Sequence, residues 1–226
     1  MVWQQRALII LTIVSIGLIW FVPSALATGP IALDGSFGDW GGQANVDDPQ
    51  GDAKNNPTDL QKFYFATNPD DETAYFMVER WLGGAQPIGL RLYIDTNNNG
   101  VFNETSDRMV DLRYKPNKND SDVDVGLFDG SETFLSSITR DIDWGESEGE
   151  GGIRVEWGVS FEQLGILPNQ TIRIYVQTMD GNSPSDRVPD NGDIQWSPAT
   201  ALGVPLLILL ILAGAGWLFY QRKKVT

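Results

Sequence analysis

The fold class of this chain follows from one stretch of its sequence, Ile153-Arg154-Val155-Glu156-Trp157-Gly158-Val159-Ser160-Phe161, in which large apolar residues occupy every second position. Because successive side chains of a β-strand point to opposite faces, this alternation predicts a strand with one buried face. The same type of pattern is present at residues 60–67, 74–81, 88–94, 109–114, 123–128 and 172–178. The sequence therefore predicts a domain built of half-buried strands.

Turn-forming residues separate these segments, and nothing between them has a sustained helical period. The one helical candidate is a single turn at residues 160–164. About nine strands of this kind favour an all-β fold, an antiparallel β-sandwich of jelly-roll-like type, over residues 28–180. Residues 181–200 are expected to form a loop and a stalk.

The first 27 residues have the pattern of a secretory signal peptide. Arg6 supplies a positive charge, residues 7–21 are apolar, and Ala25-Leu26-Ala27 fits the small-residue rule for cleavage. We therefore expect residues 1–27 to form a signal helix that is cleaved after Ala27. The alternative is an uncleaved signal anchor.

A second hydrophobic segment, residues 201–220, predicts a C-terminal transmembrane helix. It is uncharged, and at ~1.5 Å per residue its length matches the thickness of the hydrocarbon core. Arg222, Lys223 and Lys224 follow it, and the positive-inside rule places such residues in the cytoplasm. The sequence thus predicts a type I single-pass protein of the cell membrane, with an extracellular domain and a cytoplasmic tail at residues 221–226.

The composition restricts the chemistry of the expected extracellular domain. All 30 acidic residues lie between the two hydrophobic ends, whereas Arg6, Arg222, Lys223 and Lys224 lie outside that region, which keeps 12 of the 16 basic residues. The excess of acidic residues gives this domain a net negative charge, which repels nucleic acid and attracts cations. The chain has no cysteine and no histidine, so disulfides, thiol nucleophiles and histidine-based catalysis or zinc binding are excluded. An enzyme is not expected.

One loop has the composition of a calcium site. After the strand at residues 88–94, oxygen-bearing side chains recur at alternate positions, a glycine follows, and acidic residues return. Calcium binds six to eight oxygens from loops of this kind. The predicted ligands are Asp95, Asn97, Asn99, the backbone carbonyl of Val101, Glu104 and Asp107. The alternative is a plain hairpin, because Asn99-Gly100 is a strong turn signal.

A second acidic segment lies earlier in the chain. Asp48 and Asp52 flank a Pro-Gln-Gly turn, and Asp59 directly precedes a predicted strand. These three carboxylates could converge on a second cation. The alternative is an acidic surface loop without an ion.

Tryptophans are the candidate ligand-binding residues, because aromatic rings stack on sugars. Trp40 and Trp157 stand in patterns typical of a core, whereas Trp81 and Trp144 adjoin loops and are the better candidates for a ligand. The alternative is that these two rings also fill or cap the core.

Three motifs carry a resemblance to a known family. Residues 31–40 contain Asp34-Gly35 and Asp39-Trp40, residues 48–60 contain the acidic segment described above, and residues 155–165 contain a late Glu156 and a terminal Leu164-Gly165. In this order they resemble family 9 carbohydrate-binding-like and DOMON-like sandwich domains. Val159-Ser160 stands where the family pattern has Ile-Pro.

The resemblance implies a β-sandwich that often holds calcium and is attached to secreted enzymes or surface proteins. Some members bind sugars and others bind haem, but this chain has no histidine to ligate a haem iron. We therefore expect a non-catalytic, membrane-anchored extracellular module that is stabilised by calcium and binds a carbohydrate or another cell-surface ligand. The alternative is a structural or partner-binding accessory subunit of a cell-envelope complex, with an envelope protein as its partner.

Overall fold

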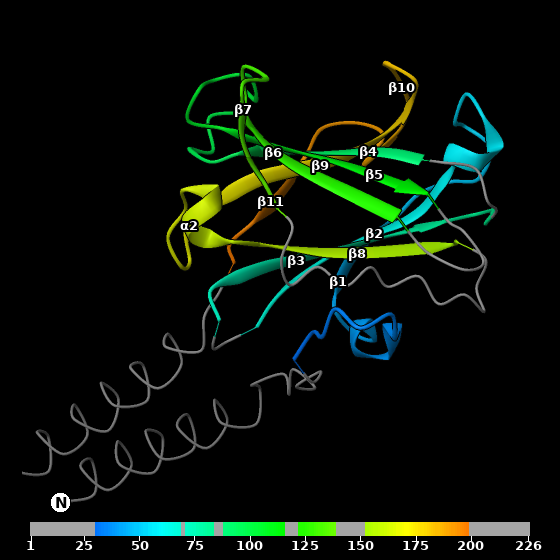
Figure 1. The fold of residues 1–226 in the computed structure, drawn as a ribbon, viewed down its shortest axis with the longest axis horizontal. Helices are drawn as coiled ribbons and strands as arrows, with labels where there is room; N and C mark the ends of the chain where they lie inside the picture. Colours follow the sequence, from blue (N-terminus) through cyan, green and yellow to red (C-terminus); the bar gives the residue numbers. More distant parts are fainter. Residues whose placement is uncertain (1–29, 69–70, 84–87, 116–121, 139–151, 199–226) are drawn as a thin grey trace, which may run out of the picture.

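The computed structural model describes residues 30–68, 71–83, 88–115, 122–138 and 152–198, which form two antiparallel β-sheets (Figure 1). The predicted signal helix, transmembrane helix and cytoplasmic tail lie outside the described residues. Within the part of the chain that is described, no helix has the length and apolar character needed to cross a membrane.

The first sheet has four strands in the order β1-β2-β3-β8. Its strands are β1 (Ala44–Asp47), β2 (Leu60–Thr67), β3 (Thr73–Arg80) and β8 (Arg154–Ser160). The stretch that begins at Ile153 thus forms the edge strand β8, which pairs with β3 over its whole length. Two short 3-10 helices, η1 (Phe37–Trp40) and η2 (Asn56–Thr58), precede β1 and β2.

The second sheet has seven strands, six of them in the order β10-β9-β4-β5-β6-β7, with β11 also pairing with β9. Consecutive hairpins connect β4 to β7, whereas β9 enters the sheet from the other layer after β8. The strands are β4 (Ile88–Asp95), β5 (Arg108–Lys115), β6 (Asp122–Asp129), β7 (Phe134–Ser137), β9 (Ile172–Asp180), β10 (Ser183–Val188) and β11 (Ile194–Trp196).

The core lies between the two sheets, as the alternating patterns predict. Phe63, Phe76 and Trp157 of the first sheet pack in one cluster with residues such as Leu92 and Ile174 of the second, and all five are at most 1% exposed. Burying such large side chains contributes about 1.5–3 kcal/mol each relative to leaving them exposed. This two-layer packing fixes the ends of the strands, and with them the loops that carry the acidic residues.

The helical turn expected at residues 160–164 is confirmed as α2 (Phe161–Leu164). Ser160 caps it: its hydroxyl accepts the backbone N–H of Gln163, whose side chain accepts the backbone N–H of Ser160 in return. Gly165 ends the helix in the left-handed conformation that glycine adopts without strain. Phe161 and Leu164 are buried, so the turn closes one end of the core.

All strands predicted from alternation are present, and residues 181–198 contain two more strands that were not predicted. That segment was expected to be a loop and a stalk, and it instead contains β10 and β11, which flank β9. The sequence of β10, Ser-Pro-Ser-Asp-Arg-Val, is polar and interrupted by a proline. Its strand conformation comes from pairing with β9, which no local pattern reports.

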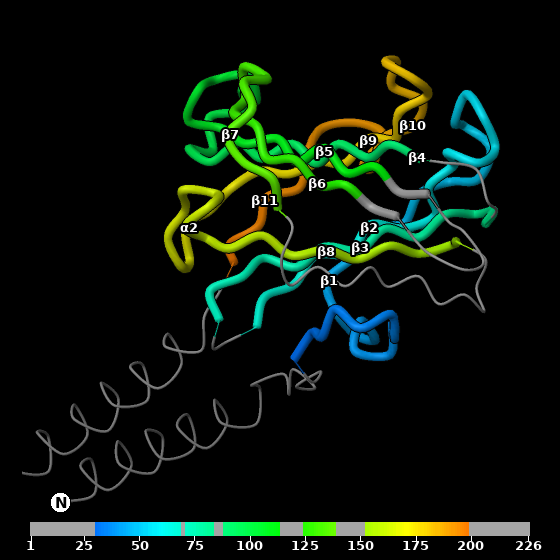
Figure 2. The backbone as a smooth tube through the Cα atoms, in the orientation of Figure 1, coloured from blue at the N-terminus to red at the C-terminus, as the bar shows by residue number. Residues whose placement is uncertain are grey.

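The N-terminal segment, residues 31–40, covers the outer face of the four-stranded sheet (Figure 2). Trp40 is 1% exposed and packs with Tyr75 and Met77 of β3, so the prediction that Trp40 belongs to a core is confirmed. Trp157, the other tryptophan predicted to be buried, is 0% exposed.

Candidate cation-binding site

Four aspartates from two distant parts of the chain converge beside β10. Asp48 and Asp52 lie between β1 and η2, Asp186 lies in β10, and Asp190 follows that strand. Each offers a carboxylate oxygen, and these oxygens all lie within 4.8 Å of one another. We call these residues the aspartate cluster. No other group of three or more acidic side chains with this spacing is found among the described residues.

Backbone hydrogen bonds hold the two halves of the cluster in place. Asp186 accepts the backbone N–H of Leu60 in β2 at 2.7 Å, a bond that joins one sheet to the other. The register of β10 shifts between Pro184 and Asp186, and a shift of this kind redirects side chains at a sheet edge. Ser185, inside the shift, shares a 2.6 Å hydrogen bond with the hydroxyl of Thr58.

Asp59, the third residue of the predicted second cation site, has a different role from the one expected. Its two carboxylate oxygens accept the backbone N–H of Gly51, at 2.9 and 3.2 Å, and it is 4% exposed. Gly51 has a φ of +93°, a conformation that favours glycine. Asp59 therefore shapes the turn that presents Asp52, and the structure does not place it in the cluster.

The cluster is electrostatically unfavourable without a cation. Asp48 is 4% exposed, and its Oδ2 has no hydrogen-bond partner among the described residues. Burial, followed by repulsion from Asp186, raises the pKa of Asp48 to about 8. Burial also raises the pKa of Asp186 and of Asp190, with repulsion from Asp52 adding to both. A buried oxygen without a partner costs free energy unless a ligand or ion satisfies it.

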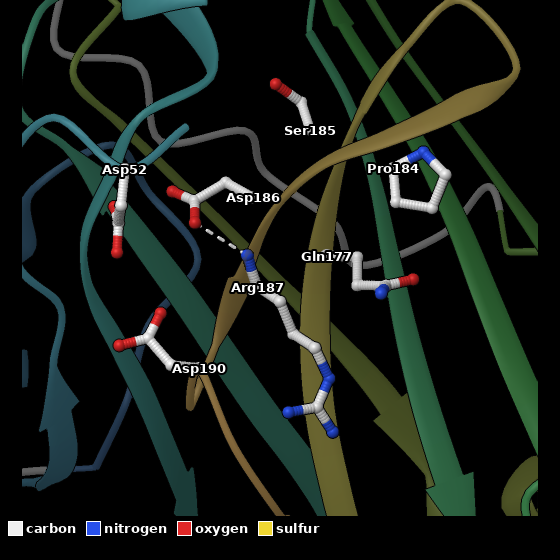
Figure 3. Close-up of a pocket in the computed structure, with 7 residues that line it drawn as sticks. All are labelled: Asp52, Gln177, Pro184, Ser185, Asp186, Arg187 and Asp190. Atoms are coloured by element: carbon white, nitrogen blue, oxygen red, sulfur yellow. Dashed lines mark hydrogen bonds between the residues drawn. The ribbon is translucent and has the colours of Figure 1, made fainter. Parts of the chain in front are cut away.

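A pocket of about 230 Å³ opens beside the cluster (Figure 3). The carboxylates of Asp52, Asp186 and Asp190 point toward a shared space on one side of it. The remaining wall comes from Gln177 of β9 and from Pro184, Ser185 and Arg187 of β10.

The guanidinium of Arg187 forms hydrogen bonds outside the cluster. It donates to the backbone carbonyls of Pro189 and Gly192. The same group lies 4.0 Å from the centroid of the Tyr175 ring, within range of a cation–π interaction. Its charge favours the ionised form of Asp190 and so opposes the rise in the pKa of that group. The hydrogen bond from Arg187 to the cluster comes from its backbone N–H, which donates to Asp186 at 2.6 Å.

Four carboxylate oxygens within 4.8 Å of one another are close enough to hold one metal ion. The prediction from sequence found Asp48 and Asp52 but missed Asp186 and Asp190, which stand in the segment that was expected to be a loop and a stalk.

The loop at residues 95–107, here called the Asp95 loop, has a different arrangement. Its two fully buried carboxylates are occupied by backbone donors: Asp95 accepts the N–H of Asn99 and of Gly100, and Asp107 accepts that of Thr96 and of Glu104. Burial raises the pKa of Asp107, while these two donors oppose the shift.

The other predicted ligands of the Asp95 loop also bond within the loop. Glu104 accepts from the side-chain amides of Asn97 and Asn99, at 2.7 and 2.9 Å. The amide oxygen of Asn99 accepts the backbone N–H of Val101. Side-chain oxygens of five predicted ligands thus accept N–H groups of the loop itself: Asp95, Asn97, Asn99, Glu104 and Asp107.

The two tryptophans proposed for ligand binding have different outcomes. Trp81 follows β3, is half-buried, and its indole nitrogen is buried without a hydrogen-bond partner among the described residues. Trp144 lies outside the described residues.

Glu156 of β8 is a fully buried acid that the sequence patterns did not identify as part of a site. Its side chain accepts the backbone N–H groups of Asp34 and Gly35, both at 3.1 Å, and the indole N–H of Trp40 at 2.6 Å. Burial raises its pKa to about 7, although these donors act in the opposite direction. The residues of the first and third motifs therefore meet at one buried carboxylate that holds the N-terminal segment on the sheet.

Comparisons of the chain with protein-family models, with curated proteins and with solved structures found no match.

Proposed function

We propose that this chain is a non-catalytic, membrane-anchored extracellular β-sandwich module of jelly-roll type, stabilised by calcium, that binds a carbohydrate or another cell-surface ligand. The proposal joins the two hydrophobic ends of the sequence to the acidic loops of the domain between them. Calcium is abundant outside the cell, where such a module would work.

One observation carries the calcium part of the proposal: the buried Oδ2 of Asp48 has no partner, in a cluster whose four carboxylates approach within 4.8 Å. Ionising all four carboxylates at this spacing is unfavourable, and a divalent cation converts that repulsion into attraction. The ion would also join the two sheets, because Asp48 follows β1 of the first sheet and Asp186 belongs to the second.

The Asp95 loop is a second, weaker candidate for calcium. Its buried carboxylates already accept two N–H groups each, so its shape does not require an ion. We therefore assign the stabilising ion to the aspartate cluster and treat the loop as a further site of lower affinity.

A structural or partner-binding subunit of a cell-envelope complex is the second candidate function. Exposed apolar residues favour it, since Phe134 and Leu135 of β7 are 56% and 47% exposed. Apolar side chains of this size at a sheet edge suit a protein contact better than a sugar.

Thermal unfolding of the full chain, purified in a non-glycosidic detergent, tests the proposal. Calcium should raise the unfolding midpoint and EDTA should reverse the effect. Asp190→Asn should lose most of the calcium response, because it removes one ligand of the cluster. The matched control is Asp124→Asn, which changes the charge equally at an exposed position on β6. Equal midpoints in calcium and EDTA for the unmodified chain would refute the calcium site.

Isothermal titration on the same preparation separates the two candidate sites by their stoichiometry. One tightly bound calcium, lost in Asp190→Asn, assigns the ion to the aspartate cluster. A second binding event that survives Asp190→Asn would assign an ion to the Asp95 loop as well.

A further inference from the structure

We infer that the calcium of the aspartate cluster contacts the ligand directly, and that the ligand is a neutral sugar or polyol that offers two adjacent hydroxyl groups. This inference rests on the proposed calcium site and assigns it a second role. The ion would both join the two sheets and form the floor of a recognition pocket.

The cluster is closed on one side and open on the other. Asp48 and Asp186 are buried, at 4% and 7% exposure, whereas Asp52 and Asp190 are exposed. Asp52, Asp186 and Asp190 line the pocket, and Asp48 does not. An ion held among these four carboxylates would therefore have protein behind it and the pocket in front of it (Figure 3).

The protein cannot fill the whole coordination shell from these four side chains acting as single ligands. Calcium takes six to eight oxygens, so about two to four positions remain for water or for a ligand. Asp186 is a poor candidate for a bidentate ligand, because its two oxygens already accept the backbone N–H groups of Leu60 and Arg187. The remaining positions face the pocket, where adjacent hydroxyl groups can replace two waters at once.

Charge selects a neutral ligand over an anionic one. Four carboxylates around one calcium keep an excess of negative charge, and an anion brought to this pocket would be repelled. The only cation in the pocket lining is Arg187, whose guanidinium is occupied by two backbone carbonyls and the Tyr175 ring. Hydroxyl oxygens coordinate calcium without adding charge.

Gln177 is the side chain that would contact the far end of the ligand: it pairs with Arg187, so it lies on the sheet face opposite to that of Asp186 and lines the other side of the pocket (Figure 3). It is half-buried on β9, it lines the pocket, and its side-chain amide has no hydrogen-bond partner among the described residues. An amide both donates and accepts, so it matches a hydroxyl group of either orientation. The pocket, at about 230 Å³, is smaller than sites for drug-sized ligands, which favours a single sugar ring or the end of a chain.

Retention on sugar-coated beads tests the inference. The full chain in a non-glycosidic detergent is applied to beads that carry glucose, mannose or galactose, in calcium or in EDTA, with beads that carry glucuronic acid as the anionic comparison. We expect calcium-dependent retention on at least one neutral sugar, release by EDTA, and weaker retention on glucuronic acid. Gln177→Ala should reduce retention about tenfold, the equivalent of one hydrogen bond.

Calcium-dependent thermal stability of Gln177→Ala should equal that of the unmodified chain, because this residue is not an ion ligand. Gln195→Ala, on the neighbouring strand β11 and outside the pocket, is the matched control and should keep full retention. Retention that is equal in EDTA, stronger on glucuronic acid, unchanged in Gln177→Ala or absent from every neutral sugar overturns the inference. If calcium still raises the unfolding midpoint in that case, the proposed ion site stands; if it does not, both proposals fail.

Discussion

The aspartate cluster and the Asp95 loop are both acidic, but they differ in whether every buried carboxylate has a hydrogen-bond donor. In the Asp95 loop, Asp95 and Asp107 are each filled by two backbone N–H groups. In the cluster, the oxygens of different aspartates face one another, and Oδ2 of Asp48 faces no donor among the described residues. They also lie apart: β9 pairs with Asp95 at Arg173 and with Asp186 at Thr178.

This difference shows what a run of acidic residues can and cannot reveal. A short loop of regular spacing closes on itself, and its own N–H groups are the nearest donors for its carboxylates. In the cluster, Asp186 also accepts two backbone N–H groups, but the buried Oδ2 of Asp48, which comes from a separate segment, has no such donor among the described residues, and a cation would satisfy it. The Asp95 loop has the sequence that more closely resembles a calcium site. Its buried carboxylates nevertheless require an ion less than those of the aspartate cluster do.

Asp48→Asn should separate the two regions most strongly. At a calcium concentration about 1,000 times Kd, bound ion stabilises the folded chain by ~4 kcal/mol, which corresponds to about 8–16 °C in the unfolding midpoint. We expect Asp48→Asn to lose this increment. In EDTA the same variant should unfold at a higher temperature than the unmodified chain at pH 7, because the amide removes an acid whose pKa is raised by burial and then by Asp186, and whose folding therefore costs free energy.

Asp47→Asn is the matched control, since Asp47 is adjacent in sequence but its side chain is 78% exposed and pairs with Lys62 at 2.8 Å. A surface ion pair contributes little, so this variant should keep the full calcium response. An Asp48→Asn chain that still gains stability from calcium would remove Asp48 from the site. One that is less stable in EDTA would show that the carboxylate has a partner.

The sequence predicted the strands far better than it predicted the site. Alternation at residues such as Val155, Trp157 and Val159 reports the burial of one sheet face, which the structure reproduces in β8. Asp48 and Asp52 were recognised as potential ligands because their spacing is local. Asp186 and Asp190 were not, because they reach the cluster only through the pairing of β10 with β9.

Glu156 is a buried carboxylate of a third kind. It accepts hydrogen bonds, as Asp95 and Asp107 do, but it belongs to neither proposed ion site. Its pKa is raised from the usual 4.5 to about 7, so the folded chain binds this proton more tightly than the unfolded chain. The resulting stabilisation is fully present below about pH 4.5 and is lost as the pH rises to about 7. Between about pH 4.5 and 7, the free energy of unfolding of the unmodified chain should fall by on the order of 3 kcal/mol relative to that of Glu156→Gln.

Urea unfolding of both chains at several pH values, in saturating calcium and in EDTA, measures this difference. The pH dependence of the difference should be the same in both conditions, because Glu156 bonds to the N-terminal segment and not to the cluster. Glu162→Gln, at an exposed position of α2, is the control and should show no such trend. A constant difference between pH 4.5 and 7 would contradict the raised pKa of Glu156.

Asp95→Asn should have the opposite signature to Asp48→Asn. The amide keeps one acceptor oxygen but presents N–H groups to Asn99 or Gly100, so one buried donor loses its partner. We expect a loss of about 1–3 kcal/mol in urea unfolding, equal in calcium and in EDTA. A loss that appears only in calcium would show that the Asp95 loop holds the ion.

A pair of glycine substitutions tests the smallest expected difference between the two regions. Each region contains one glycine with the same backbone conformation and the same kind of hydrogen bond. Gly51 and Gly100 have φ values of +93° and +85°, each donates its N–H to a buried aspartate, and a Cβ at either position would meet no atom within 4 Å. Alanine at either position therefore costs only backbone strain, about 1–2 kcal/mol. Gly51→Ala should in addition weaken calcium binding several-fold in titration, because the strained turn displaces Asp52, whereas Gly100→Ala should leave calcium affinity unchanged. If both substitutions weakened calcium binding equally, both loops would contribute to calcium binding, and the proposed difference between the two regions would be wrong.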